Sequence, residues 1–98
     1  MTQPTKQIKR MRRRRELLDR YKIKQGCADC GYNANPYALQ WDHDDPDKKI
    51  YTPHRMASYS IKKIFAEARK CTIRCANCHA IRTVEEKHYA LRKQLGEE

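Results

Sequence analysis

Two pairs of cysteines, each with two residues between its members, constrain the fold of this chain more than any other feature. They are Cys27 and Cys30 near the start and Cys75 and Cys78 far along the chain. A tight turn brings the two sulfurs of such a pair to one side, and four thiolates satisfy the tetrahedral preference of Zn²⁺ with no open position. The sequence therefore predicts a closed structural zinc site. A redox-active pair is the alternative, but that chemistry does not need two distant copies.

The composition explains why such a cross-link is needed. The chain has 98 residues, of which 39% are hydrophobic and 35% charged. A single small domain of this kind buries a thin core, so metal binding would supply part of its folding free energy. No N-terminal apolar segment resembles a signal peptide, and no run approaches the ~18 apolar residues of a membrane span. We expect a cytoplasmic protein, in a bacterium or a phage-infected host, where paired cysteines bind metal more often than they form disulfides.

The fifth cysteine, Cys71, stands outside the two pairs. The residue type is most often a small buried apolar group. A second interpretation makes it a substitute metal ligand in a minor state.

The net charge of +10 is concentrated near the N-terminus. Residues 1–25 are predicted to form a basic helical arm that precedes a domain over residues 26–98, because apolar residues recur there at helical intervals: Ile8, Met11, Leu18 and Tyr21. The arm's wide cationic face suits a phosphate backbone, so the expected partner is DNA and not a membrane. A solvated helix, or an arm that is disordered until it meets DNA, is the alternative.

The rest of the chain predicts an α+β fold. Alternating residues over 38–43 indicate a strand, which a polar loop over 44–49 and an irregular segment over 51–59 follow. A helical apolar pattern spans 60–70, and a second short strand spans 71–75. The last helix follows the second cysteine pair and ends near Gly96, with apolar or partly apolar positions at Ile81, Val84, His88, Leu91 and Leu95.

Three residues next to the cysteines carry potential chemistry. Asp42 and His43 form a pair at the end of the first predicted strand, and His79 directly follows Cys78. One carboxylate and one imidazole can hold a divalent ion while leaving positions open for water and phosphate. The second imidazole can take a proton from water near neutral pH. Neighbouring residues on a strand face opposite sides, so Asp42 and His43 are expected to act on different sides of a phosphate. A plain surface turn is the alternative for this pair.

With these residues in view, LQWDHDDPDKK and KCTIRCANCHAIRT, framed by CADCG, resemble the HNH endonuclease family in the zinc-supported form frequent in phage genomes. The resemblance covers residues 27–83. It implies a ββα-metal core, with His43 as the general base that activates water. It also implies that Asp42 and His79 hold Mg²⁺, Mn²⁺ or a similar ion at the leaving oxygen.

The family's middle asparagine has no clear counterpart here. No Asn occurs between His43 and Cys75, so Asn77 is the candidate, either in that role or as part of the knuckle turn. His54 lies in a loop that could fold over the site, although an exposed loop histidine is the favoured interpretation.

The sequence thus predicts a metal-dependent DNA endonuclease with weak sequence preference and salt-sensitive binding. A homodimer or a phage packaging partner such as a terminase would be needed for double-strand cutting. The alternatives are a non-catalytic zinc-knuckle protein that binds nucleic acid, and a structural adaptor or toxin-like protein.

Overall fold

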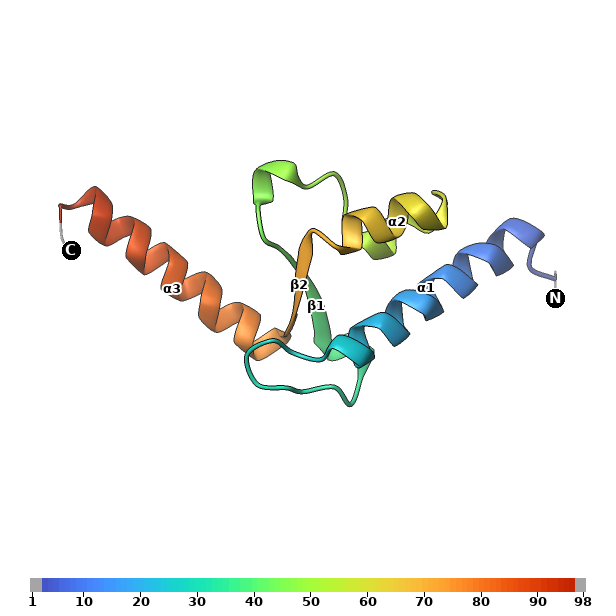
Figure 1. Ribbon diagram of the computed structural model, residues 1–98, viewed down its shortest axis with the longest axis horizontal. Helices are drawn as coiled ribbons and strands as arrows, with labels where there is room; N and C mark the ends of the chain where they lie inside the picture. Colours follow the sequence, from blue (N-terminus) through green and yellow to red (C-terminus); the bar gives the residue numbers. More distant parts are fainter. Residues whose placement is uncertain (1–2, 97–98) are drawn as a thin grey trace.

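A computed structural model describes residues 3–96, apart from the side chains of residues 88 and 89, and gives a small α+β fold (Figure 1). The elements run α1 (Lys6–Gln25), β1 (Leu39–His43), α2 (Ile61–Ala68), β2 (Cys71–Cys75) and α3 (Ala76–Gln94). The helices and strands expected from the sequence are confirmed, while the expected packing of His88 lies outside the described side chains.

The segments expected to be loops also contain 3-10 turns at Pro36–Ala38, Pro46–Lys48 and Pro53–Met56. In each of these turns a proline occupies the first position, where its fixed φ suits helical backbone.

Local caps set the ends of the helices. The Thr5 hydroxyl accepts a hydrogen bond from the backbone of Ile8 at the start of α1, and Ser60 does the same for Lys63 in α2. Gly26 ends α1 with a φ of 68°, a left-handed conformation that costs a glycine little. The cap of α3 is the Cys75 sulfur, which accepts from the backbone N–H of Cys78 at 3.4 Å. The last helix therefore starts directly from the second cysteine pair.

The two strands pair antiparallel, with Leu39 opposite Cys75 and His43 opposite Cys71. Side chains alternate between the two faces of this ribbon. Gln40 contacts His79 of α3 on one face, whereas His43 contacts α2 on the other. The same short strand thus supplies functional side chains to both helices.

The core consists of two apolar groups that share Trp41. One group surrounds the cysteine pairs: Cys27, Leu39, Ile73 and Cys75. The other lies between α1 and α2: Leu18, Met56 and Ile64. Tyr21 of α1 stacks on Trp41 with 5.7 Å between ring centroids, so the second half of α1 is part of the core.

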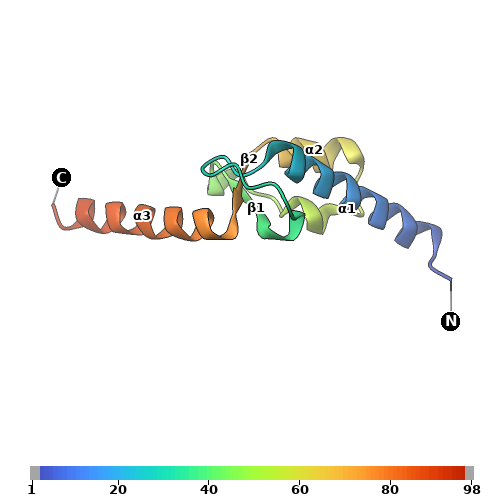
Figure 2. The same cartoon turned by 90° about the horizontal axis from the view of Figure 1, so that it is seen from below.

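Both terminal helices extend well beyond this core. The molecule measures 59 × 28 × 26 Å and has a radius of gyration of 16.5 Å, against about 13 Å for a compact chain of this length. Figures 1 and 2 show the first half of α1 and most of α3 leaving the body in different directions. None of the helices in the described residues combines the length and apolar composition needed to span a bilayer.

Candidate metal and catalytic centre

The four paired cysteines meet in one group, as the sequence predicts. The sulfurs of Cys27, Cys30, Cys75 and Cys78 all lie within 4.8 Å of one another, and those of Cys30 and Cys75 are 3.8 Å apart. Four sulfurs at the Zn–S distance of ~2.3 Å form a tetrahedron with edges of about 3.8 Å. A disulfide would need about 2.05 Å. The group therefore has the donor set and the spacing to hold a tetrahedral metal ion such as zinc.

The backbone around Cys27 favours the ionised form of its thiol. Burial opposes ionisation of Cys27, but hydrogen bonds from the backbone of Cys75, Cys30 and Asp29 outweigh it and lower the pKa of Cys27 to about 6. Cys75 and Cys78 lie at the N-terminus of α3, and the side-chain contact with Cys75, together with burial, raises the pKa of Cys78. Thiolates are the form in which cysteine binds metal.

Cys71 lies at the opposite end of β2 from Cys75, about 13 Å away at the rise of a strand. Burial, together with the nearby carboxylates of Glu67 and Asp44, raises the pKa of Cys71 to about 12. Its sulfur points to the backbone carbonyl of Glu67 at 3.6 Å. A neutral thiol so far from the group fits the interpretation of Cys71 as a small packed residue. It does not fit the interpretation of Cys71 as a substitute metal ligand.

Asp42 and His79 face each other across the gap between β1 and α3. The Nδ1 of His79 lies 2.6 Å from the side-chain oxygen of Gln40, which can only accept, so Nδ1 carries the proton. The lone pair of Nε2 then points toward Oδ1 of Asp42, 3.8 Å away. Two electron-pair donors with no proton between them can hold a divalent ion, since ligands about 2.1 Å from one ion lie roughly 3–4 Å apart. The hydrogen bond to Gln40 fixes the tautomer, as outer-shell partners of metal-binding histidines do.

His43 is buried and bonded to a residue that the sequence analysis missed. Its Nε2 lies 2.9 Å from a carboxylate oxygen of Glu67, and the side chains are 5% and 2% exposed. Burial alone would raise the pKa of Glu67, but hydrogen bonds from Lys70, the backbone of Ile50 and His43 lower it. An ionised carboxylate only accepts, so Nε2 of His43 is the donor and Nδ1 keeps its lone pair. A signal existed in the sequence, because Glu67 lies three residues after Ile64 on the apolar face of its helix.

Asp42 and His43 border one hollow of about 200 Å³. Its lining combines the ends of the strands with one side of α3: Asp42, His43, Asp44, Pro46, Arg74, Arg82 and Glu86. Arg74 connects it to the cysteine group, because its guanidinium binds Asp42 at 2.7 Å and Asp29, which lies between the first two cysteines, at 3.0 Å. The first cysteine turn and the candidate catalytic carboxylate are therefore held by one side chain.

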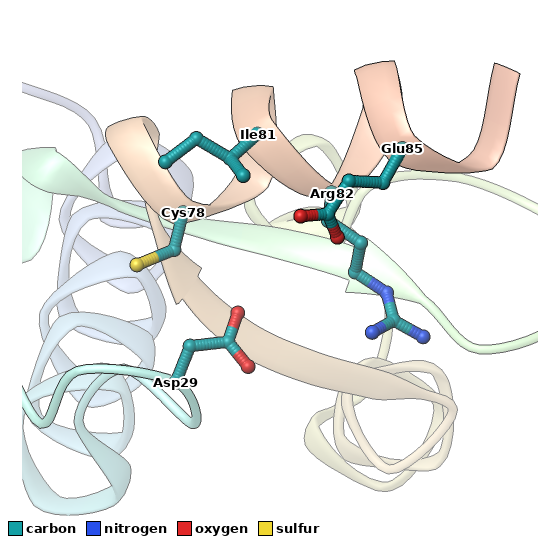
Figure 3. Close-up of a pocket in the computed structure, with 5 residues that line it drawn as sticks. All are labelled: Asp29, Cys78, Ile81, Arg82 and Glu85. Carbon is teal, nitrogen blue, oxygen red and sulfur yellow. The ribbon is translucent and has the colours of Figure 1, made fainter. Parts of the chain in front are cut away.

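A second hollow of about 230 Å³ lies on the other side of Arg82, lined by Asp29, Cys78, Ile81, Arg82 and Glu85 (Figure 3). Figure 3 shows Asp29 reaching from the cysteine turn toward α3, with Arg82 and Glu85 on the helix opposite. Arg82 borders both hollows. Its guanidinium also forms an exposed ion pair with Glu86 at 3.1 Å. The charge of Arg82 is thus available to a ligand in either hollow.

Asn77 does not line the hollow beside Asp42 and His43. It is exposed in the first turn of α3 and lines a separate hollow with Cys30 and Tyr32. The side chain that contacts His43 is instead that of Glu67.

His54 is not the exposed loop residue that the sequence favours. Its Nδ1 accepts a hydrogen bond from Trp41 at 2.9 Å, and its Nε2 donates to Asp19 of α1 at 2.8 Å. Burial lowers the pKa of His54, and Asp19 opposes this only in part. The imidazole therefore joins α1 to β1 as a neutral group.

In comparisons with known proteins, no family model matches this chain, and no curated protein or solved structure shows a significant similarity to it.

Proposed function

We propose that this protein is a metal-dependent DNA endonuclease that hydrolyses phosphodiester bonds. The observation that carries the proposal is the hollow that Asp42 and His43 both line, where Nε2 of His79 faces Asp42 and Glu67 binds His43. The resemblance to HNH endonucleases assigns the same three residues to metal binding and base catalysis. The cysteine group would hold Zn²⁺ as a structural ion.

In this proposal His43 takes a proton from water through Nδ1, which makes no hydrogen bond to the residues that the structure describes. Glu67 fixes the tautomer and stabilises the imidazolium that forms. When Mg²⁺ or Mn²⁺ is bound by Asp42 and His79, it supplies positive charge to the leaving oxygen. Arg82 lies at the edge of the hollow, where a phosphate would meet its guanidinium.

The polyanionic substrate is inferred from the exposed half of α1. A shallow hollow there is lined only by cations: Lys6, Lys9, Arg10 and Arg13. Other basic residues of α1 serve the fold instead, since Arg14 binds the carbonyl of Ala57 and Lys22 lies over the ring of Trp41. Phosphate contacts from the free half give affinity without sequence information, so binding should weaken steeply with salt.

A non-catalytic zinc-knuckle protein that binds nucleic acid is the second candidate. It would use the same cysteine group and the same cationic helix. Only the hollow around His43 distinguishes the two, because binding alone does not require a buried His–Glu pair beside two facing metal-binding groups.

Incubation of supercoiled plasmid with the full chain and Mg²⁺ or Mn²⁺ tests the proposal. We expect nicking by the wild type and a loss of roughly 100-fold or more in His43→Ala, the scale of a lost general base, with zinc content unchanged. Asp47→Asn, which removes an exposed carboxylate outside the hollow, is the matched control and should cut normally.

Equal cutting by His43→Ala and the wild type would refute the role of His43. Absence of cutting with every divalent ion tried, in a preparation that still binds DNA, would favour the binding protein.

A further inference from the structure

After its first turn, α3 carries a stripe of large apolar side chains that the described residues do not cover. Their exposed fractions are 58% for Ile81, 50% for Val84, 54% for Leu91 and 68% for Leu95. Ile81 still borders the hollow beside Cys78, but the rest of the helix runs away from the body (Figure 1), so no core supports it. Isolated helical segments of this length are marginal in water, and burying an apolar face against a partner stabilises them.

The spacing of the stripe is that of a coiled-coil seam. Positions 81, 84, 91 and 95 fit the a, d, d and a positions of successive heptads, and His88, whose side chain lies outside those described, takes the a position between 84 and 91. His79, Arg82 and Glu86, which belong to the catalytic side, fall at the f and b positions on the opposite face of the helix. A partner on the seam would therefore leave the catalytic hollow open.

We propose that α3 pairs with α3 of a second copy of this chain as an antiparallel two-stranded coiled coil. The flanking charges select this partner and this direction. With Val84 of one helix opposite Leu95 of the other, Glu85 of each copy lies beside Arg92 of its mate, which gives two opposite-charge contacts. A parallel pair would instead set Lys87 against Arg92, two cations, at both flanks.

This register fixes where the catalytic hollows lie. The twofold axis passes between residues 89 and 90, so the two bodies sit at opposite ends of the paired helices. The two His79 residues are then displaced by about 32 Å along the helix axis, at 1.5 Å per residue. If the nuclease proposal holds, one dimer carries two separate centres, as cutting of both strands requires.

The first test measures mass without DNA or activity, so its result does not depend on the nuclease proposal. Sedimentation equilibrium of the zinc-loaded full chain should show a concentration-dependent species of twice the 11.7 kDa chain. Leu91→Lys should weaken the dimer by at least about tenfold, because it removes a buried seam residue and sets a charge there. Ala90→Lys adds the same charge one residue away, off the seam, and should keep the dimer.

The second test sets the direction of the helices. In the antiparallel arrangement Arg92→Glu places a carboxylate against Glu85 of the mate and weakens the dimer, and adding Glu85→Arg restores it. In a parallel arrangement Arg92→Glu would strengthen the dimer, because Lys87 would then face a carboxylate. That result, or a mass of one chain up to about 1 mM, would overturn the proposal.

Discussion

At the scale of single residues, the unusual group is the carboxylate of Glu67. A buried charge costs several kcal/mol unless hydrogen bonds compensate for it. Here three donors reach the carboxylate: Lys70 at 2.8 Å, His43 at 2.9 Å and the backbone of Ile50 at 3.1 Å. The arrangement holds His43 rigidly and leaves one ring nitrogen available, as a positioned general base requires.

Glu67→Gln tests this positioning role. The amide oxygen can keep the bonds from Ile50 and His43, but a neutral amide no longer stabilises a protonated imidazole. We expect nicking to fall by about 10²-fold or more. The acidic limb of its pH profile should move to lower pH, a readout that a purely structural role would leave unmoved. Glu16→Gln, on the exposed side of α1, is the control; a pH profile of Glu67→Gln that matches the wild type would refute the assignment.

His54 makes the stability depend on pH. Its pKa is lower in the folded protein than the ordinary value of about 6.5, so the unfolded chain binds a proton first as the pH falls. The stabilising contribution of the neutral imidazole is therefore complete above about pH 6.5 and is lost as the pH falls toward the folded pKa. Asp19, Lys22 and Arg15 face the ring, and protonation would also break the bond from Trp41.

Urea unfolding of the zinc-loaded protein between about pH 5 and 8 measures this effect. His54→Gln can keep the bonds to Trp41 and Asp19 but does not titrate. Its free energy of unfolding should fall less on acidification than that of the wild type, while proton release from the cysteine group affects both proteins alike. Parallel pH profiles would show that His54 does not contribute.

At the scale of elements, α1 has two halves with different tasks. The first half is exposed and cationic, whereas the second packs Leu18 and Tyr21 into the core. The helix predicted as an arm over residues 1–25 is thus continuous with the domain. Its polar contacts also reach the Pro53–Met56 turn, through Arg15 and the carbonyl of His54.

Two adjacent leucines of α1 differ in burial and therefore test how this helix packs. Leu18 is fully buried, while its neighbour Leu17 is only partly covered. Leu18→Ala should lower the free energy of unfolding by about 2–4 kcal/mol through lost burial and a residual cavity. Leu17→Ala should cost clearly less. Denaturant unfolding compares them, and equal losses would mean that α1 does not pack as described.

At the scale of the whole molecule, the cysteine group connects elements that are otherwise weakly held together. It joins the turn after α1 to the junction of β2 and α3, and Asp29 extends the link through Arg74 to Asp42. With so few buried apolar residues, the body depends on this cross-link. Loss of a metal ion bound by the cysteines is therefore expected to disturb the hollow beside Asp42 as well as the fold.

Replacement of a ligand tests the cross-link. Cys27→Ser or Cys78→Ser should abolish the cooperative melting transition and the bound zinc, as should a strong chelator applied to the wild type. Cys71→Ser, at the far end of β2, should keep both. A Cys27→Ser protein that melts cooperatively and still contains zinc would refute the closed four-cysteine site.

The sequence by itself determined the features that depend on spacing along the chain. Apolar periodicity defined α1, α2 and α3, and the two cysteine pairs identified their common group, because these signals are local or chemically unusual. The strand alternation also predicted that Asp42 and His43 face different sides.

Only the tertiary structure decided which distant residues meet. Glu67 contacts His43 because β1 pairs with β2, and His54 reaches Trp41 because a turn folds back onto α1. Neither contact can be predicted from the spacing of residues in the sequence, because the packing of separate elements sets both contacts. The cysteine group was predictable because two such pairs form one metal-binding set of four thiols. Glu67 as the partner of His43 was not, because many side chains can fill that position.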